Sequence, residues 1–62
     1  MDDDLKLGKV VRVKGSQLIG VVSCEQFYNQ FKNCYCIKFI WVNSGEINEM
    51  EIPVKCVELY EE

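Results

Sequence analysis

The chain has 62 residues, of which 48% are apolar and 27% charged, with a formal net charge of −3. A chain of this length forms one domain with a small core, because folding buries only about 60% of its unfolded surface. No apolar run reaches the roughly 20 residues that cross a bilayer. Because the N-terminus is acidic, unlike the basic start of a signal peptide, we expect a cytoplasmic protein. Its single domain is expected to be ordered over about residues 6–60, with frayed acidic ends at 1–4 and 61–62.

Runs of Val, Ile and aromatic residues between short polar or glycine-bearing segments predict a series of short β-strands. The first strand is expected at 9–14, where valines alternate with basic residues, and a turn at 15–17 leads into a second strand at 18–24. Gly20 interrupts the second strand, which is typical of a bulge or of a close approach by another backbone.

The segment 34–42 gives the strongest strand prediction, because it is rich in β-branched and aromatic residues. Side chains along a strand point alternately to its two faces. We assign one of these faces to the core, with Tyr35, Ile37, Phe39 and Trp41. The opposite face carries Cys34, Cys36, Lys38, Ile40 and Val42.

The segment 43–46 is predicted to form a hairpin loop, with Gly45 at the position that requires a positive φ. A fourth strand is expected at 47–52, with Met50 and Ile52 pointing inward. The proline that follows ends this strand, because proline has no N–H to donate to a neighbouring strand.

The end of the chain is predicted to form a single helical turn at 53–56 and a short fifth strand at 57–60. Two structures fit the connection at 25–33 between the second and third strands. It forms either a helical turn with Phe27 and Phe31 on one side, or a continuation of both strands into a long hairpin closed near residues 29–30. We favour the long hairpin.

Five short strands in this order resemble the small barrels of the Src-homology-3-like superfamily, particularly Tudor-like and KOW-like domains. The resemblance covers about residues 8–60, and three segments carry it: GKVVRVKGSQLIGVV, CIKFIWVNSGEINEMEI and EIPVKCVELYEE. It implies an all-β, five-stranded barrel with a short helical turn before the last strand. Members of this superfamily bind nucleic acid, methylated peptides or protein surfaces. A Tudor-like aromatic cage would draw on Tyr28, Tyr35, Trp41 and Tyr60, although Tyr35 and Trp41 are also assigned to the core.

Four cysteines have the spacing C-x9-C-x-C-x19-C, at Cys24, Cys34, Cys36 and Cys56. Structural zinc sites usually contain C-x2-C pairs, and the chain has no histidine to complete a mixed site. Two cysteines one residue apart on a strand are about 7 Å apart, which is too far for a disulfide between them. We therefore expect free thiols, with zinc binding and disulfides as the alternatives.

The groups that most enzymes use are missing from the sequence, which predicts a protein that is not an enzyme and needs no cofactor. Without histidine there is no Ser-His or Cys-His pair, and no glycine-rich phosphate loop is present. Glu49 and Glu51 share one strand face, but their simplest role is to keep a strand edge soluble.

The leading hypothesis is a protein-binding adaptor, small subunit or inhibitor, of the kind that phages also encode. Phe27, Tyr28 and Phe31 lie in a connecting segment, and exposed aromatic rings are typical interface anchors. Ile40 and Val42 lie on the uncovered face of their strand and suggest pairing with another chain along an exposed strand edge.

Nucleic-acid binding is the second hypothesis, and a structural homodimer is the third. Without the acidic ends, seven basic and five acidic residues remain, and a basic strip would contact phosphates. That strip consists of Lys6, Lys9, Arg12, Lys14 and Lys32. The net charge of −3 argues against it, because nucleic-acid-binding domains usually carry a dominant positive field.

Overall fold

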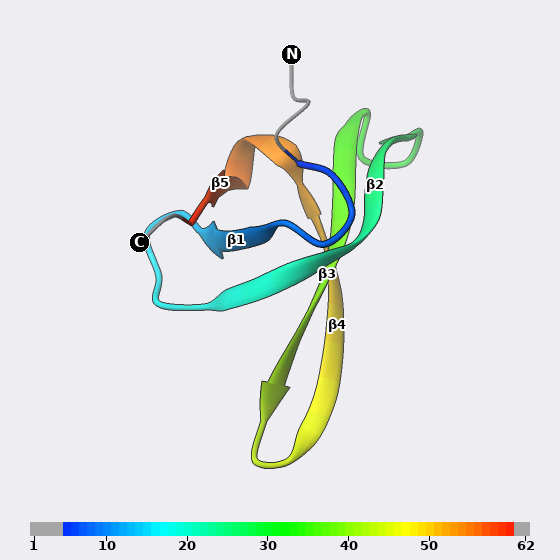
Figure 1. Cartoon of the computed structure of the whole chain (residues 1–62). Helices are drawn as coiled ribbons and strands as arrows, with labels where there is room; N and C mark the ends of the chain where they lie inside the picture. Colours follow the sequence, from blue (N-terminus) through cyan, green and yellow to red (C-terminus); the bar gives the residue numbers. More distant parts are fainter. Residues whose placement is uncertain (1–4, 61–62) are drawn as a thin grey trace.

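The computed structural model describes residues 5–60 and shows an all-β chain with five antiparallel strands in one sheet (Figure 1). The strands are β1 (Val10–Val13), β2 (Ile19–Asn29), β3 (Cys34–Asn43), β4 (Glu46–Pro53) and β5 (Val57–Leu59), and a 3-10 turn, η1 (Val54–Cys56), precedes β5. Their order across the sheet is β4-β3-β2-β1-β5. The acidic ends expected to fray, 1–4 and 61–62, lie outside the described residues.

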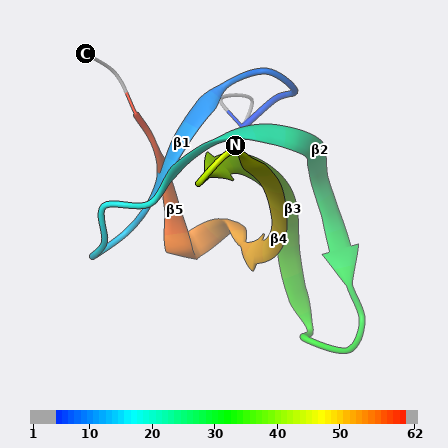
Figure 2. The ribbon, with the colours of Figure 1, turned by 90° about the horizontal axis from the view of Figure 1, so that it is seen from below.

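The sheet curls strongly (Figure 2), but within residues 5–60 its two edges do not pair with each other. The prediction of five strands with a helical turn before the last one is confirmed, whereas the predicted closure into a barrel is wrong. The lengths of the edge strands explain the difference. β5, one of the two edge strands, has only three residues, so it presents a very short edge for pairing with β4. No helix among residues 5–60 has the length and apolar character needed to cross a membrane.

The turn between β3 and β4 follows from its sequence. Asn43 pairs with Glu46, and the two residues between them have positive φ, 54° at Ser44 and 79° at Gly45. Two central residues with positive φ define a type I′ turn, whose twist matches that of the flanking strands. The predicted hairpin at 43–46 is therefore confirmed.

The long hairpin favoured for 25–33 is also confirmed, since β2 continues to Asn29 and pairs there with Cys34 of β3. No helical turn forms in this segment of the described chain. The pairing register shifts twice, between Val22 and Cys24 and again between Cys24 and Phe27. Such bulges increase the local twist, which lets β2 bend around the core.

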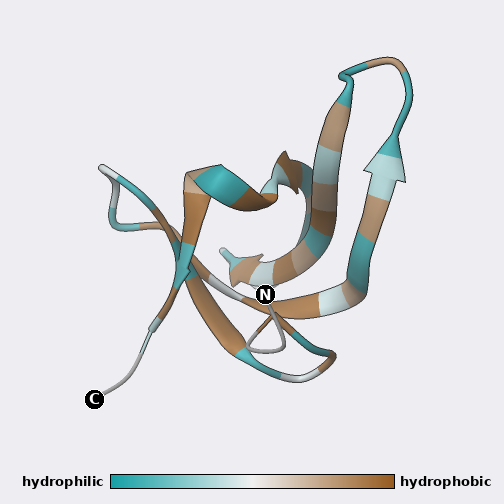
Figure 3. Ribbon diagram, turned by 90° about the horizontal axis from the view of Figure 1, so that it is seen from above, coloured by the Kyte–Doolittle hydropathy of each residue, from teal (hydrophilic) through white to brown (hydrophobic). Residues whose placement is uncertain are grey.

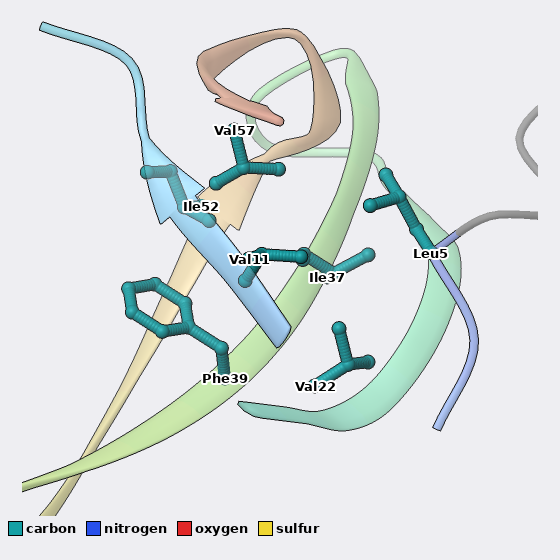
Figure 4. Packing of buried hydrophobic residues seen from close by; sticks show 7 residues of the cluster. All are labelled: Leu5, Val11, Val22, Ile37, Phe39, Ile52 and Val57. Carbon is teal, nitrogen blue, oxygen red and sulfur yellow. The ribbon is translucent and has the colours of Figure 1, made fainter. Parts of the chain in front are cut away.

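The core lies inside the curl of the sheet (Figure 4). It consists of Leu5, Val11, Val22, Ile37, Phe39, Ile52 and Val57. Ile37 and Phe39 are wholly buried, as predicted for the middle of β3. A Cβ atom at Gly20 would lie 2.5 Å from the carbonyl oxygen of Ile40 and 2.5 Å from the ring of Phe39. Only glycine therefore allows β2 to cross β3 this closely.

Three predictions of burial are wrong. Tyr35 is 51% exposed and Met50 39% exposed, although both were assigned to the core. Cys36 is wholly buried, although it was assigned to the outer face. Tyr35 lies near the start of β3, beyond the core, whereas Met50 lies opposite Phe39 but on the edge strand β4. Cys36 is instead enclosed between its lateral partners, Phe27 of β2 and Pro53 of β4.

Candidate protein-binding surface

An apolar groove lies across the four strands β1 to β4, largely on the face that points away from the core. It has a volume of about 290 Å³. Its lining consists of Val10, Ile19, Gly20, Val21, Ile40, Trp41, Val42 and Ile47. In Figure 3 the apolar residues of β1, β2 and β3 appear as brown segments on neighbouring ribbons.

The register of the sheet brings these residues together from distant parts of the sequence. Val10 of β1 pairs with Val21 of β2, and Val21 pairs with Ile40 of β3, which makes one apolar row across three strands. Val42 lies two residues beyond Ile40, on the same face, and pairs with Ile47 of β4. The groove therefore exists only when the four strands are aligned.

The end of the groove at the β3–β4 hairpin is the most exposed. Val42 is 69% exposed and Ile47 is 74% exposed, and this hairpin projects beyond the other strands (Figure 1). The ring of Trp41 also lines the groove. It is held in place by stacking on the ring of Phe39, with 5.3 Å between the ring centroids and 29° between the ring planes. Large aliphatic side chains are thus left in water at the end of the molecule that protrudes furthest.

Polar groups border the groove. The guanidinium group of Arg12 donates hydrogen bonds to the carboxylate of Glu58 across the β1–β5 pair. The hydroxyl of Ser23 donates a hydrogen bond of 3.0 Å to the carboxylate of Glu49. An apolar centre with a polar rim is the usual anatomy of a protein–protein interface.

Of the residues predicted to bind a partner, the structure places Ile40 and Val42 in the groove and the aromatic ones elsewhere. The aromatic segment lies at the β2–β3 tip, at the opposite end of β3 (Figure 1). Val42 lies eight positions after Cys34 along the strand, a distance of about 26 Å. The two predicted parts of the binding site are therefore separate surfaces.

The aromatic rings at the β2–β3 tip do not form one cluster. Phe31 is 100% exposed, whereas Tyr28 packs edge-on against Tyr35 with ring centroids 5.2 Å apart. The hydroxyl of Tyr28 also donates a hydrogen bond to the side chain of Asn33. Phe27 neighbours Tyr28 along the strand, so it points to the other face, where it is half-buried.

The four aromatic residues considered for a cage are not brought together. Only Tyr28 and Tyr35 are in contact. Trp41 lies six residues beyond Tyr35 along β3, a distance of about 20 Å. The backbone N–H of Tyr60 donates a hydrogen bond to the carbonyl oxygen of Val10, on the side of β1 that faces away from β2.

The predicted basic residues fall into two groups. Lys32 lies at the β2–β3 tip, where its Nζ is 3.8 Å from the carboxylate of Glu51. The remaining four, Lys6, Lys9, Arg12 and Lys14, precede or belong to β1 and its turn. Arg12 is paired with Glu58, while the three lysines are exposed.

The four cysteines are free thiols. The Sγ atoms of Cys34 and Cys36 are 3.9 Å apart, because the two side chains share one face of β3. Burial raises the pKa of the Cys36 thiol, and its hydrogen bond with Cys34 raises it further. No group of three or more potential metal ligands occurs within residues 5–60.

Six of the eight groove residues were not among those predicted to bind a partner: Val10, Ile19, Gly20, Val21, Trp41 and Ile47. A signal was present, since the segments VVRV and IGVV carry apolar residues at consecutive positions and therefore on both strand faces. Only one face can point to the core. The apolar residues of the other face then need either an internal cover or a partner.

No protein-family model matches the chain, and no significant match is found among curated proteins or solved structures.

Proposed function

We propose that the chain is a non-catalytic protein-binding module and that its partner covers the apolar groove. The observation that carries this proposal is the row of aliphatic side chains left in solvent, with Val42 and Ile47 about three-quarters exposed. Covering apolar surface is favourable by about 25 cal/mol for each Å² removed from water. Contiguous apolar patches with a polar border usually mark interaction sites for this reason.

The chemistry of the groove favours binding over catalysis. Its eight lining residues are aliphatic except for Trp41 and Gly20, and none carries a titratable or nucleophilic side chain. Such a lining provides affinity through burial and specificity through shape. The groups that move protons or form covalent intermediates are missing from this surface.

The fold is consistent with a small adaptor, subunit or inhibitor. Five antiparallel strands with a helical turn before the last strand support the proposed kinship with Src-homology-3-like domains. Function is a property of the site and not of the fold, so the groove carries the argument and this kinship is secondary. The exposed Phe31 at the opposite tip provides a natural control surface.

The test is capture of partners from the source cell's lysate, at moderate salt and with nuclease, by three forms of the tagged chain. These are the wild type, the groove double variant Val42→Thr/Ile47→Thr, and the tip variant Phe31→Ser. Threonine keeps the branched shape and the strand propensity while adding a hydroxyl, so the fold is retained. We expect the groove variant to lose the captured protein and the tip variant to retain it.

Other outcomes would overturn the proposal. Equal capture by the wild type and the groove variant would show that the groove is not the binding surface. Capture that disappears with nuclease and weakens steeply with salt would indicate nucleic-acid binding through Lys6, Lys9 and Lys14. A dimeric mass by light scattering that the groove variant converts to a monomer would indicate a structural homodimer.

A further inference from the structure

The edge strand β4 presents an unpaired row of backbone groups beside the groove. It is the outermost strand at one side of the sheet. The type I′ turn bonds Asn43 to Glu46, so their pair is a hydrogen-bonded one. Hydrogen-bonded and non-hydrogen-bonded pairs alternate along an antiparallel ladder. The backbone groups of Ile47, Glu49 and Glu51 therefore point away from β3, toward the open side of the sheet.

Pro53 fits this alternation. Its pair with Cys36 is a non-hydrogen-bonded one, like the pair of Ile47 with Val42. Its missing N–H therefore removes no hydrogen bond to β3. It removes a donor only from the open side. Three consecutive outward-facing residues, from Ile47 to Glu51, thus remain available to an added strand before Pro53 ends the row.

The side chains of these three residues lie on the same face as the groove. Ile47 is part of the groove lining, Glu49 lies opposite Ile40, and Glu51 lies opposite Lys38. A strand that paired with β4 would place alternate side chains beside Ile47 and Glu49. Its backbone would form hydrogen bonds with the unpaired N–H and C=O groups of β4. One of its side chains would cover part of the apolar groove.

The charges along β4 decide what kind of strand fits. β4 contains three glutamates and no lysine or arginine. Glu51 is already bonded to Asn29 and Lys32. Glu49 accepts one hydrogen bond, from Ser23, and takes part in no ion pair within residues 5–60. Its carboxylate is exposed at the edge and is available to a cation on the added strand.

A second copy of this chain does not meet that requirement. Because β4 has no basic residue, no register of β4 against β4 gives Glu49 a positive partner. An added strand must pair its own outward-facing residues with those of β4. The two antiparallel registers of β4 against β4 that do so with the longest overlap set Glu49 opposite Glu49 or opposite Glu51. Like charges directly opposite each other on neighbouring strands are destabilising. The charge pattern therefore favours a different protein.

We infer that β4 binds an extended segment of another protein as an added strand. This segment carries a Lys or Arg opposite Glu49 and an apolar residue opposite Ile47, two positions apart because every second residue shares a face. Backbone pairing provides affinity, and the basic and apolar side chains provide selectivity. The inference rests on the proposed function, since it names the chemistry of the partner at the same surface.

The test uses three nine-residue, Thr-rich peptides that differ only at one central position, which is Lys, Glu or Ser, and that all carry an Ile two positions after it, on the same face. Binding to the full chain is followed by fluorescence anisotropy at low and moderate salt. We expect the Lys peptide to bind roughly fivefold more tightly than the Glu peptide, as one opposite-charge pair replaces one like-charge pair. Glu49→Gln should abolish this preference, and Glu49→Lys should reverse it.

Amide hydrogen exchange distinguishes strand pairing from nonspecific peptide binding, because only pairing protects particular amides of β4. The outward-facing amides of Ile47 and Glu49 should gain protection when the Lys peptide binds. Those of Asn48 and Met50, which already bond to β3 by the same alternation, should change little. These neighbouring residues are the internal control.

The inference and the proposed function can fail separately. If no peptide protects the β4 amides, or if Lys and Glu peptides bind equally, the inference is wrong while a groove-dependent capture still supports the proposed function. If the Lys peptide protects the edge but Val42→Thr/Ile47→Thr still captures the cellular partner, the groove proposal fails alone. A β4-mediated dimer of the chain would also overturn the inference.

Discussion

The two ends of β3 carry exposed apolar residues of opposite kinds. At the end shared with β2, Tyr28 and Tyr35 pack on each other, and Phe31 is exposed by itself. At the end shared with β4, Val42 and Ile47 continue the aliphatic row that runs from Ile40 of β3 across β2 to β1. Aromatic residues close in sequence thus end on different faces, while valines and isoleucines far apart in sequence form one surface. Strand register, more than residue type, determines which exposed residues make a site.

The first prediction concerns the middle of β3, which holds both ends in place. Phe39 is wholly buried and stacks on Trp41. Phe39→Ala should cost about 3–5 kcal/mol, comparable to the whole stability of so small a domain, so both surfaces should be lost together. Urea denaturation followed by tryptophan fluorescence measures this effect. A cooperative transition with an unchanged midpoint would show that the two ends do not depend on a shared core.

The second prediction separates the groove end from the tip. Gly20→Ala would place a methyl group against the backbone of Ile40 and the ring of Phe39. Overpacking of this kind costs about 1–3 kcal/mol, and the strands that line the groove must move apart. Val21→Ala, at the next and exposed position, is the control and should cost less than about 1 kcal/mol. Equal losses in urea denaturation would mean that the close crossing of β2 and β3 is unimportant.

The third prediction compares aromatic residues on the same face of β3. Trp41 is partly buried against the core and Tyr35 is half-exposed. Trp41→Ala should cost about 2 kcal/mol, below the value for a fully buried ring. Tyr35→Ala should cost under about 1 kcal/mol, since it loses mainly its edge contact with Tyr28. Circular dichroism during urea denaturation checks both. Similar losses would show that the core extends to the tip.

The elements of the fold were largely predictable from the sequence, because they follow from local rules. The type I′ turn at Ser44 and Gly45, the glycine in β2 and the end of β4 at Pro53 each have a local physical cause. Barrel closure was not predictable in this way. It depends on whether β4 and β5 are long enough to meet, which neither strand specifies alone.

The candidate binding surface was predictable only in part, for a related reason. Ile40 and Val42 were found because alternation within β3 leaves them on the outer face. Val10, Val21 and Ile47 join them only through pairing between strands. Cys36 shows the same limit, because its burial comes from lateral neighbours on β2 and β4 and not from the face on which it lies.

The smallest predicted effect concerns that cysteine. Burial, followed by the hydrogen bond with Cys34 and the charge of Glu51, raises the pKa of the Cys36 thiol in the folded chain. The unfolded chain therefore loses this proton first, once the pH rises above about 8.5. Between the unfolded and folded pKa values the folded chain holds more protons, so this thiol makes stability fall as the pH rises.

Cys36→Val should remove this part of the decline, and the measurement is the urea midpoint of each chain between pH 7 and 10. The informative quantity is the difference between the variant and the wild type at each pH. Cys24→Val, which leaves the buried thiol in place, should keep the wild-type decline. If Cys36→Val declined equally, the Cys36 thiol would ionise as easily in the folded chain as in the unfolded one. The β2–β3 end of the sheet would then be open to water on both faces at Cys36, and burial of this side chain would no longer distinguish that end from the groove end.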